Sequence, residues 1–220
     1  MKRSTTAARG VLALTTLALL LQATTALGYV RTTTSRGRGI FWQESCVFLV
    51  PPTNWPAELT YADSLAAIQT AADQWNAIPG SYIQFVLEEP QAGLVAEYRP
   101  GGGNVNAVLF VDSGWPHDAA AAGLTTITYI TSDSADEDGR IVDTDVEINA
   151  DDFVFSTTGQ ADRHDLANVL THEFGHVLGL DHTCDDGLGQ PTPTDHLGTV
   201  IPSCFPIASL PPNITEPTMF

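Results

Sequence analysis

The segment from His172 to His182 constrains this chain more than any other part of its sequence, because it reads HExxHxxGxxH. His172 and His176 lie four residues apart, so on a helix their imidazoles project from one face, one turn apart. Gly179 allows the chain to leave that helix in a left-handed conformation, and the turn that follows can bring His182 back toward the other two. Three imidazole ligands that leave a fourth position open are typical of a catalytic zinc site.

Glu173 follows the first histidine and places a carboxylate beside the predicted metal. Bound zinc lowers the pKa of water to about 7, and an adjacent carboxylate can take the proton as water attacks a carbonyl. The alternative interpretation is a helix with two surface histidines, but five specified positions in eleven residues favour the metal site. We therefore predict His172, His176 and His182 as zinc ligands and Glu173 as the general base.

The first 28 residues have the features of a secretory signal peptide. Three basic residues lie within the first nine, an apolar run covers 11–21, and small residues follow around Ala26. The apolar run is shorter than the roughly 20 residues that span a bilayer. We therefore predict cleavage of 1–28 and secretion, with no membrane attachment afterwards. The other 192 residues, in a chain with 43% hydrophobic content, suffice for one globular domain.

The chain is strongly acidic. Its formal net charge is −17, or −20 without the three basic residues of the signal, so nucleic acid and anionic membranes are excluded as partners. Two explanations fit this charge: solubility outside the cell, or structural Ca²⁺ held by clustered carboxylates. The clustered acidic residues are Asp133, Asp136, Glu137 and Asp138, followed by Asp143, Asp145, Asp151 and Asp152. None of these stretches matches an EF-hand loop.

The chain has three cysteines, and an exported protein normally pairs an even number of them. Cys184 and Cys204 flank one loop just after the zinc motif, so we predict a disulfide between them. Cys46 is then either free or paired with a cysteine outside this chain.

The pattern along the chain predicts alternating strands and helices. Residues 29–39 are basic and rich in threonine, and we expect a flexible lead-in there. Strands are predicted at 40–50, 81–87, 105–112, 124–131 and 141–149, and helices at 60–78 and 162–178. From Thr183 onward, proline, glycine and aspartate indicate a long loop. The order β-α-β-β-β-β-α favours an α/β or α+β layer with the helices covering one sheet.

The motif HEFGHVLGLDH is similar to the signature of the metzincin zinc peptidases, and two upstream stretches resemble the strands before the zinc helix in bacterial matrixin-like enzymes. These stretches are 123–129 and 139–149. The resemblance implies an α+β fold with a twisted, mostly parallel five-stranded sheet, an antiparallel edge strand and two long covering helices. It also implies that 40–220 form the catalytic domain.

By the same resemblance, the protein is a secreted zinc endopeptidase, and we expect it to be a monomer. Its protein or peptide substrate would bind in an extended conformation along the edge strand 124–129. Metzincins place a methionine beneath the zinc, and Met219 is the candidate here. Because the family continues into a C-terminal helix, the resemblance predicts that this catalytic domain is truncated at its C-terminus.

Other functions remain open at this point. A zinc-binding extracellular binding or adhesion module that does not cleave is the alternative from a different class. The thermolysin-like branch, which takes a glutamate as its third ligand, fits poorly because no glutamate lies between Glu173 and Glu216. His117, His164 and His196 could bind a second zinc, but a surface position is favoured for each.

Overall fold

The computed structural model describes residues 29–185, 187, 193–195, 197–210 and 219. The predicted signal segment and His196 lie outside these residues. The described elements are β1 (Val30–Arg31), β2 (Cys46–Val50), α1 (Tyr61–Asn76), β3 (Gln84–Leu87), β4 (Asn106–Val111), β5 (Gly123–Tyr129), β6 (Ile141–Asn149), β7 (Phe155–Ser156), β8 (His164–Asp165), α2 (Leu166–Val177), β9 (Leu180–Asp181) and a short 3-10 helix, Ile207–Ser209.

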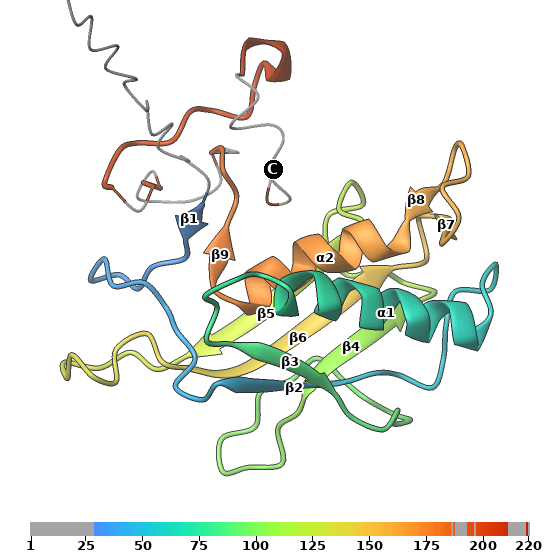
Figure 1. The fold of residues 1–220 in the computed structure, drawn as a ribbon, viewed down its shortest axis with the longest axis horizontal. Coiled ribbons are helices and arrows are strands. Elements are labelled where there is room, and N and C mark those ends of the chain that lie inside the picture. The colour runs from blue at the N-terminus through green and yellow to red at the C-terminus, as the bar shows by residue number, and fades with distance from the viewer. Residues whose placement is uncertain (1–28, 186, 188–192, 196, 211–218, 220) are drawn as a thin grey trace, which may run out of the picture.

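The main sheet has five strands in the order β3-β2-β4-β6-β5. Neighbouring strands are parallel, except that β5 runs antiparallel to β6 and forms one edge. Helices α1 and α2 lie side by side on one face of this sheet (Figure 1). The fold class expected from the sequence is therefore confirmed: α+β, a mostly parallel five-stranded sheet, an antiparallel edge strand and two covering helices.

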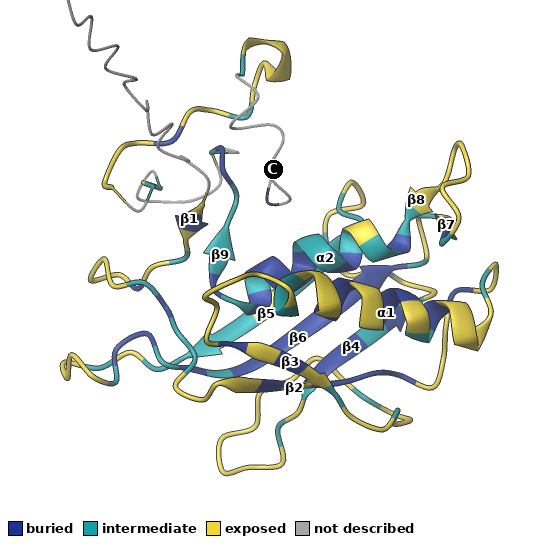
Figure 2. Ribbon diagram, viewed as in Figure 1, coloured by how far each residue is buried: buried dark blue, intermediate teal, exposed yellow. Residues whose placement is uncertain are grey.

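The hydrophobic core fills the layer between the sheet and the two helices. Figure 2 shows buried residues along β4 and β6 beneath the helices, and exposed residues on the outer side of α1. Two tryptophan indoles donate hydrogen bonds into α2: Trp75 to the carbonyl of Thr171 at 2.8 Å and Trp42 to that of Val177 at 2.7 Å. These bonds hold α2, which carries the zinc motif, against α1 and against the segment between β1 and β2 that contains Trp42.

The helix predicted at 162–178 begins later, at Leu166. Asp162 adopts a left-handed φ of 63°, and His164–Asp165 pair with β7 as strand β8. The side chain of Asp165 then caps the helix by accepting the N–H of Asn168. The helix predicted at 60–78 is α1, which ends at Asn76.

Strand β6 is buried on both faces. Its sequence alternates between apolar and polar residues, a pattern that is typical of a strand with one exposed face. Val146 and Ile148 enter the core beneath the helices, so Asp143, Asp145 and Glu147 face the opposite side. Asp145 accepts the backbone N–H of Ala107. Burial and the neighbouring Asp145 raise the pKa of Asp143 to about 7. These acidic residues are thus part of a covered sheet face.

Residues 29–39, expected to form a flexible lead-in, make specific contacts in the structure. Val30 is buried and pairs with Asp181 of β9. Thr34 donates a hydrogen bond to the buried carboxylate of Asp138 in the loop between β5 and β6. Residues 29–39 therefore contact two separate parts of the chain: strand β9, directly before His182, and the loop that connects β5 to β6.

Candidate metal centre

Helix α2 presents His172 and His176 on one face, one turn apart. Their ring centroids lie 5.0 Å apart, as the four-residue spacing predicts. The helix ends at Val177, and the N–H of Leu178 returns to the carbonyls of its last turn. The two histidines therefore occupy the final, well-packed turns of a capped helix.

Gly179 takes the chain out of the helix, with a φ of 79°. This confirms the predicted left-handed exit. A second constraint was not visible in the sequence: a Cβ at this position would lie 2.8 Å from Cγ1 of Ile40. Both the backbone conformation and the packing against Ile40 therefore require glycine here.

His182 reaches the centre through the short strand β9, which pairs antiparallel with β1. The carboxylate of Asp181 accepts the N–H of His182 at 2.8 Å, which stabilises this turn. The Nε2 atoms of His172 and His182 lie 3.0 Å apart. Strand pairing with the N-terminal segment thus places the third imidazole opposite the helix.

The three histidines converge on one point. One ring nitrogen from each of His172, His176 and His182 lies within 4.8 Å of the others, and they are half-buried. Nδ1 of His176 donates to the carbonyl of Leu180 at 2.9 Å, which leaves the lone pair of Nε2 for a ligand bond. Burial, reinforced by His172, lowers the pKa of His176 to about 3. The neutral imidazole that zinc requires is therefore the stable form, and this donor set fits a zinc ion.

Glu173 is buried beside these imidazoles, with 5% of its surface exposed. The hydroxyl of Thr125 on β5 lies 2.7 Å from its Oε2. Burial raises the pKa of Glu173 to about 7, and the hydrogen bond from Thr125 acts in the opposite direction. The carboxyl group of Glu173 can therefore both accept and release a proton near neutral pH.

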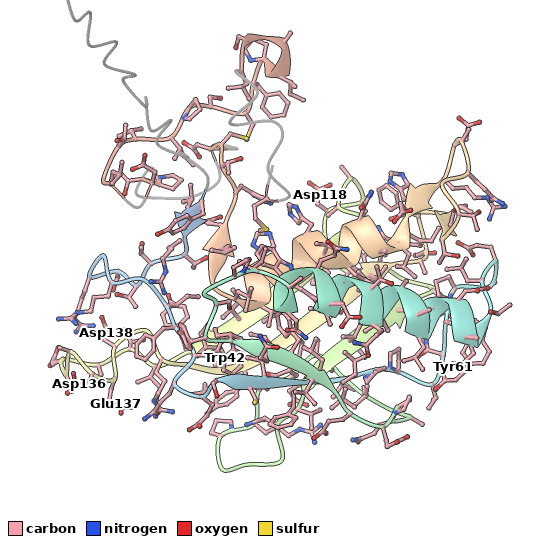
Figure 3. The ribbon with its side chains drawn as sticks, viewed as in Figure 1. Trp42, Tyr61, Asp118, Asp136, Glu137 and Asp138 are labelled. Atoms are coloured by element: carbon pink, nitrogen blue, oxygen red, sulfur yellow. A yellow bond between two sulfur atoms is a disulfide. The ribbon has the colours of Figure 1, made fainter. Side chains whose placement is uncertain are left out.

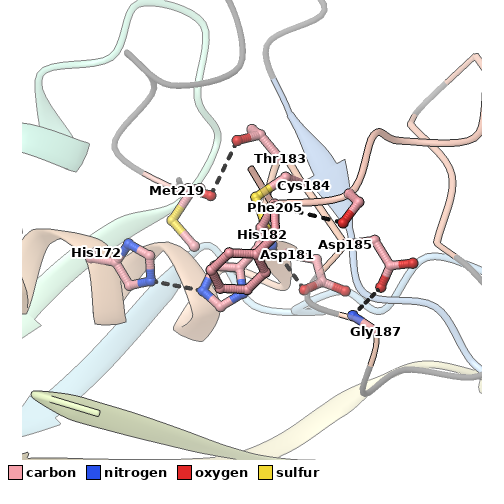
Figure 4. The surroundings of a disulfide bond; sticks show 11 residues. His172, Asp181, His182, Thr183, Cys184, Asp185, Gly187, Phe205 and Met219 are labelled. Carbon is pink, nitrogen blue, oxygen red and sulfur yellow. Dashed lines mark hydrogen bonds between the residues drawn. A yellow bond between two sulfur atoms is a disulfide. The ribbon is translucent and has the colours of Figure 1, made fainter. Parts of the chain in front are cut away.

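Met219 packs directly against helix α2, which carries His172 and His176. A Cβ on Gly175 would lie 2.1 Å from its sulfur, so the glycine between Phe174 and His176 leaves room for the methionine. The carbonyl of Met219 accepts the N–H of Thr183 at 2.9 Å. Figure 4 shows the longer contact of 3.5 Å from the hydroxyl of Thr183 to the same carbonyl. The methionine expected beneath the site is therefore buried next to it.

The disulfide predicted between Cys184 and Cys204 is present, and it begins two residues after His182 (Figure 4). Next to it, the N–H of Cys204 donates to the carbonyl of Asp185 at 2.9 Å. Cys46 has an exposed, free thiol at the start of β2. The bridge therefore ties the segment that follows the third histidine to a distant part of the same loop.

The remaining histidines do not form a second centre among the described residues. His117 contacts Glu147 through Nε2 at 3.0 Å, and its ring stacks edge-on against Trp115. His164 is exposed and lies against Phe153. The surface position favoured for these residues therefore fits His164, whereas His117 is half-buried in contact with the carboxylate of Glu147.

The acidic clusters give the calcium expectation no support. Asp136, Glu137 and Asp138 lie together in the loop between β5 and β6 (Figure 3). The carboxylate of Asp138 accepts the N–H of Ser132, which lowers its pKa, together with the hydroxyl of Thr34 and the charge of Arg36. Among the described residues, no cluster of carboxylates brings three ligand atoms close enough for one ion.

Thr125 and Gly123 both contact Glu173, and neither was identified from the sequence. Their contact depends on how β5 is placed across from α2, and no local pattern encodes that distance. The strand itself was predicted, so the signal available was its alternation: Gly123 and Thr125 share one face.

Two comparisons bear on this site. Residues 84–188 match the family model of the matrixins, a segment that runs from β3 past His182 and includes the zinc motif. No curated protein matches the chain significantly. No described helix is long and apolar enough to cross a membrane.

Proposed function

Because the chain carries a matrixin-like metzincin catalytic domain, we propose that it is an exported, zinc-dependent endopeptidase. The observation that carries this proposal is the convergence of three imidazoles on one point with a buried carboxylate next to them. The family match supports a zinc metallopeptidase at family level, and the identity of each functional residue is part of the proposal.

His172, His176 and His182 are the proposed zinc ligands. The hydrogen bond from Nδ1 of His176 to Leu180 orients that ring, and the N–H bond to Asp181 orients the backbone of His182. When bound, zinc polarises the scissile carbonyl and acidifies water. Three protein ligands leave a position open for that chemistry.

Glu173 is the proposed general base. It takes a proton from the water that attacks the scissile carbonyl, and it then delivers this proton to the leaving nitrogen, so that its own charge is restored. A pKa of about 7, raised by burial, suits a group that must accept and then release a proton. A carboxylate with the ordinary solution pKa of about 4.3 would be a weaker base for the first step, the removal of a proton from water.

The proposed substrate is a protein or peptide in an extended conformation. Strand β5 forms the edge of the sheet, and its residues Gly123 and Thr125 contact Glu173. An extended chain that pairs with this edge through its backbone would pass the catalytic carboxylate. Backbone pairing does not select side chains, so we expect cleavage of many unfolded sequences.

Secretion, a monomeric state and the absence of nucleic-acid or membrane partners are also proposed. The Cys184–Cys204 disulfide supports an oxidising compartment. The net charge of −17 opposes binding to polyanions and anionic lipids. The structural role suggested for Ca²⁺ receives no support and is not part of the proposal.

The decisive experiment compares the wild type with Glu173→Ala. The protein is expressed with its signal segment, recovered from the medium, and assayed for zinc content and for cleavage of unfolded casein. We expect one zinc per chain in both, with cleavage in the wild type alone. One zinc per chain without cleavage that depends on Glu173 would overturn the peptidase proposal and favour the zinc-binding module.

A further inference from the structure

The carboxylate of Glu173 lies against two residues of β5, one on each of its oxygens. The hydroxyl of Thr125 is 2.7 Å from Oε2 and 3.1 Å from the backbone carbonyl of Glu173 itself. On the other side, a Cβ built on Gly123 would lie 2.7 Å from Oε1 and 3.0 Å from the carboxylate carbon. The carboxylate therefore occupies a space bounded by a donor on one side and by bare backbone on the other.

The register of the sheet places these two residues. Gly123 pairs with Ile148 and Thr125 with Val146, and both partners are core residues beneath the helices. Because side chains alternate along a strand, Gly123 and Thr125 face α2 while Leu124 points away. A shift of one residue would turn both away from Glu173.

From this arrangement we infer that Thr125 is a positioning residue for the catalytic carboxylate, and that Gly123 preserves the space that the carboxylate needs. Thr125 acts through Glu173: its hydroxyl proton is donated to Oε2 and fixes the rotamer of a side chain that otherwise turns about three bonds. This inference rests on the proposed role of Glu173 as general base.

The competing explanation is that Thr125 merely ties β5 to α2 through the backbone carbonyl of Glu173. A hydroxyl has one proton, so it donates to one of the two oxygens at a time. The carboxylate oxygen is the nearer one and carries charge, which favours it as the acceptor. A tie of strand to helix would affect stability, whereas positioning affects turnover.

The test compares Thr125→Val with Thr125→Ser. Valine keeps the shape of threonine and lacks the hydroxyl, whereas serine keeps the donor. We expect Thr125→Val to lower kcat roughly tenfold to a hundredfold, the loss that follows from a misplaced catalytic group. KM and zinc content should not change, and Thr125→Ser should recover most of the lost turnover.

Thr144→Val is the matched control. Thr144 lies on the neighbouring strand β6, is buried, and hydrogen-bonds Asn106 through its hydroxyl. Its replacement also removes a buried hydroxyl from the sheet and should lower the Tm by a few degrees. We expect no change in kcat, because this side chain does not touch Glu173.

Gly123→Ala tests the other side of the carboxylate. The new methyl group would require Oε1 to move, so kcat should fall while zinc content is kept. Crystal structures of the wild type, Thr125→Val and Gly123→Ala should show the carboxylate of Glu173 held in one position in the wild type and displaced in both variants.

The inference is overturned if Thr125→Val keeps the kcat of the wild type, or if its loss of turnover is matched by losses of zinc and of thermal stability. The crystal structures decide the question without turnover. If the wild type does not cleave casein, the peptidase proposal fails, and an unmoved carboxylate in Thr125→Val would still contradict the positioning role separately.

Discussion

The two halves of the candidate metal centre are built by different means. His172, Glu173 and His176 come from consecutive turns of α2, a capped helix whose inner face is fully buried. His182 comes from a short return segment, Leu180–Cys184, that is held by β1, by Met219 and by the disulfide. Local sequence therefore suffices for the first half, whereas the second depends on parts of the chain that are distant in sequence.

This difference predicts an unequal response to removal of the metal. Only the folded chain offers the zinc site, so zinc stabilises the folded state. The free energy of unfolding should therefore be about 4 kcal/mol lower with a chelator than with free zinc at a thousand times its Kd. Backbone hydrogen exchange should rise more in Leu180–Cys184 than in Leu170–Val177, since the helix keeps its cap and its core packing. Equal changes in both segments would show that the helix also depends on the ion.

The disulfide is the covalent support of the return segment. Replacing both cysteines, Cys184→Ala with Cys204→Ala, should cost about 3 kcal/mol, the value for a closed loop of this length. Because the bridge lies two residues after His182, affinity for zinc should fall as well. Denaturant titration and competition with a zinc chelator measure the two effects. Cys46→Ala, at an exposed free thiol, is the control and should change neither.

Gly179 joins the two halves, and its replacement tests the junction itself. Gly179→Ala forces a Cβ into a left-handed backbone, which costs about 1–2 kcal/mol, and against Cγ1 of Ile40. We expect a total loss of about 2–3 kcal/mol and weaker zinc binding.

Gly37→Ala provides the matched comparison for this junction. Gly37 has a similar φ of 74°, but nothing lies within 4 Å of its missing Cβ. The free energy of unfolding of the Gly37→Ala variant should therefore fall by about 1 kcal/mol, and its affinity for zinc should not change. Equal losses at both glycines would mean that contact with Ile40 does not matter.

The same division explains which parts of the fold could be predicted from the sequence. Helical spacing identified α1 and α2, and runs of apolar residues identified the five strands of the main sheet, because these signals are local. The HExxHxxGxxH spacing identified the three histidines that the structure brings together. The pairing of Cys184 with Cys204 followed from their position around one loop.

The missed features all depend on contacts between distant segments. The pairing of Val30 with Asp181 leaves no periodic signal in a two-residue strand. The two explanations considered for the acidic charge, solubility and bound Ca²⁺, did not anticipate that Asp143 and Asp145 of β6 are buried in the structure. The contact of Thr125 with Glu173 required the distance between a strand and a helix.

The smallest effect is expected in the half that local sequence determines. Asp165→Ala removes the cap on the N–H of Asn168 and should lower the free energy of unfolding by about 1 kcal/mol. His172 and His176 lie about two and three turns beyond Asp165 along a helix that is packed in the core, so zinc affinity should not change.

Thr60→Ala is the corresponding change in α1, where Thr60 caps the N–H of Asp63. The two variants should lose similar stability, and titration with a zinc chelator should give wild-type affinity for both. If Asp165→Ala weakened zinc binding and Thr60→Ala did not, fraying would have to extend from the first turn of α2 as far as His172. The helix would then need its cap to present the ligands, and the contrast between the two halves would be one of degree.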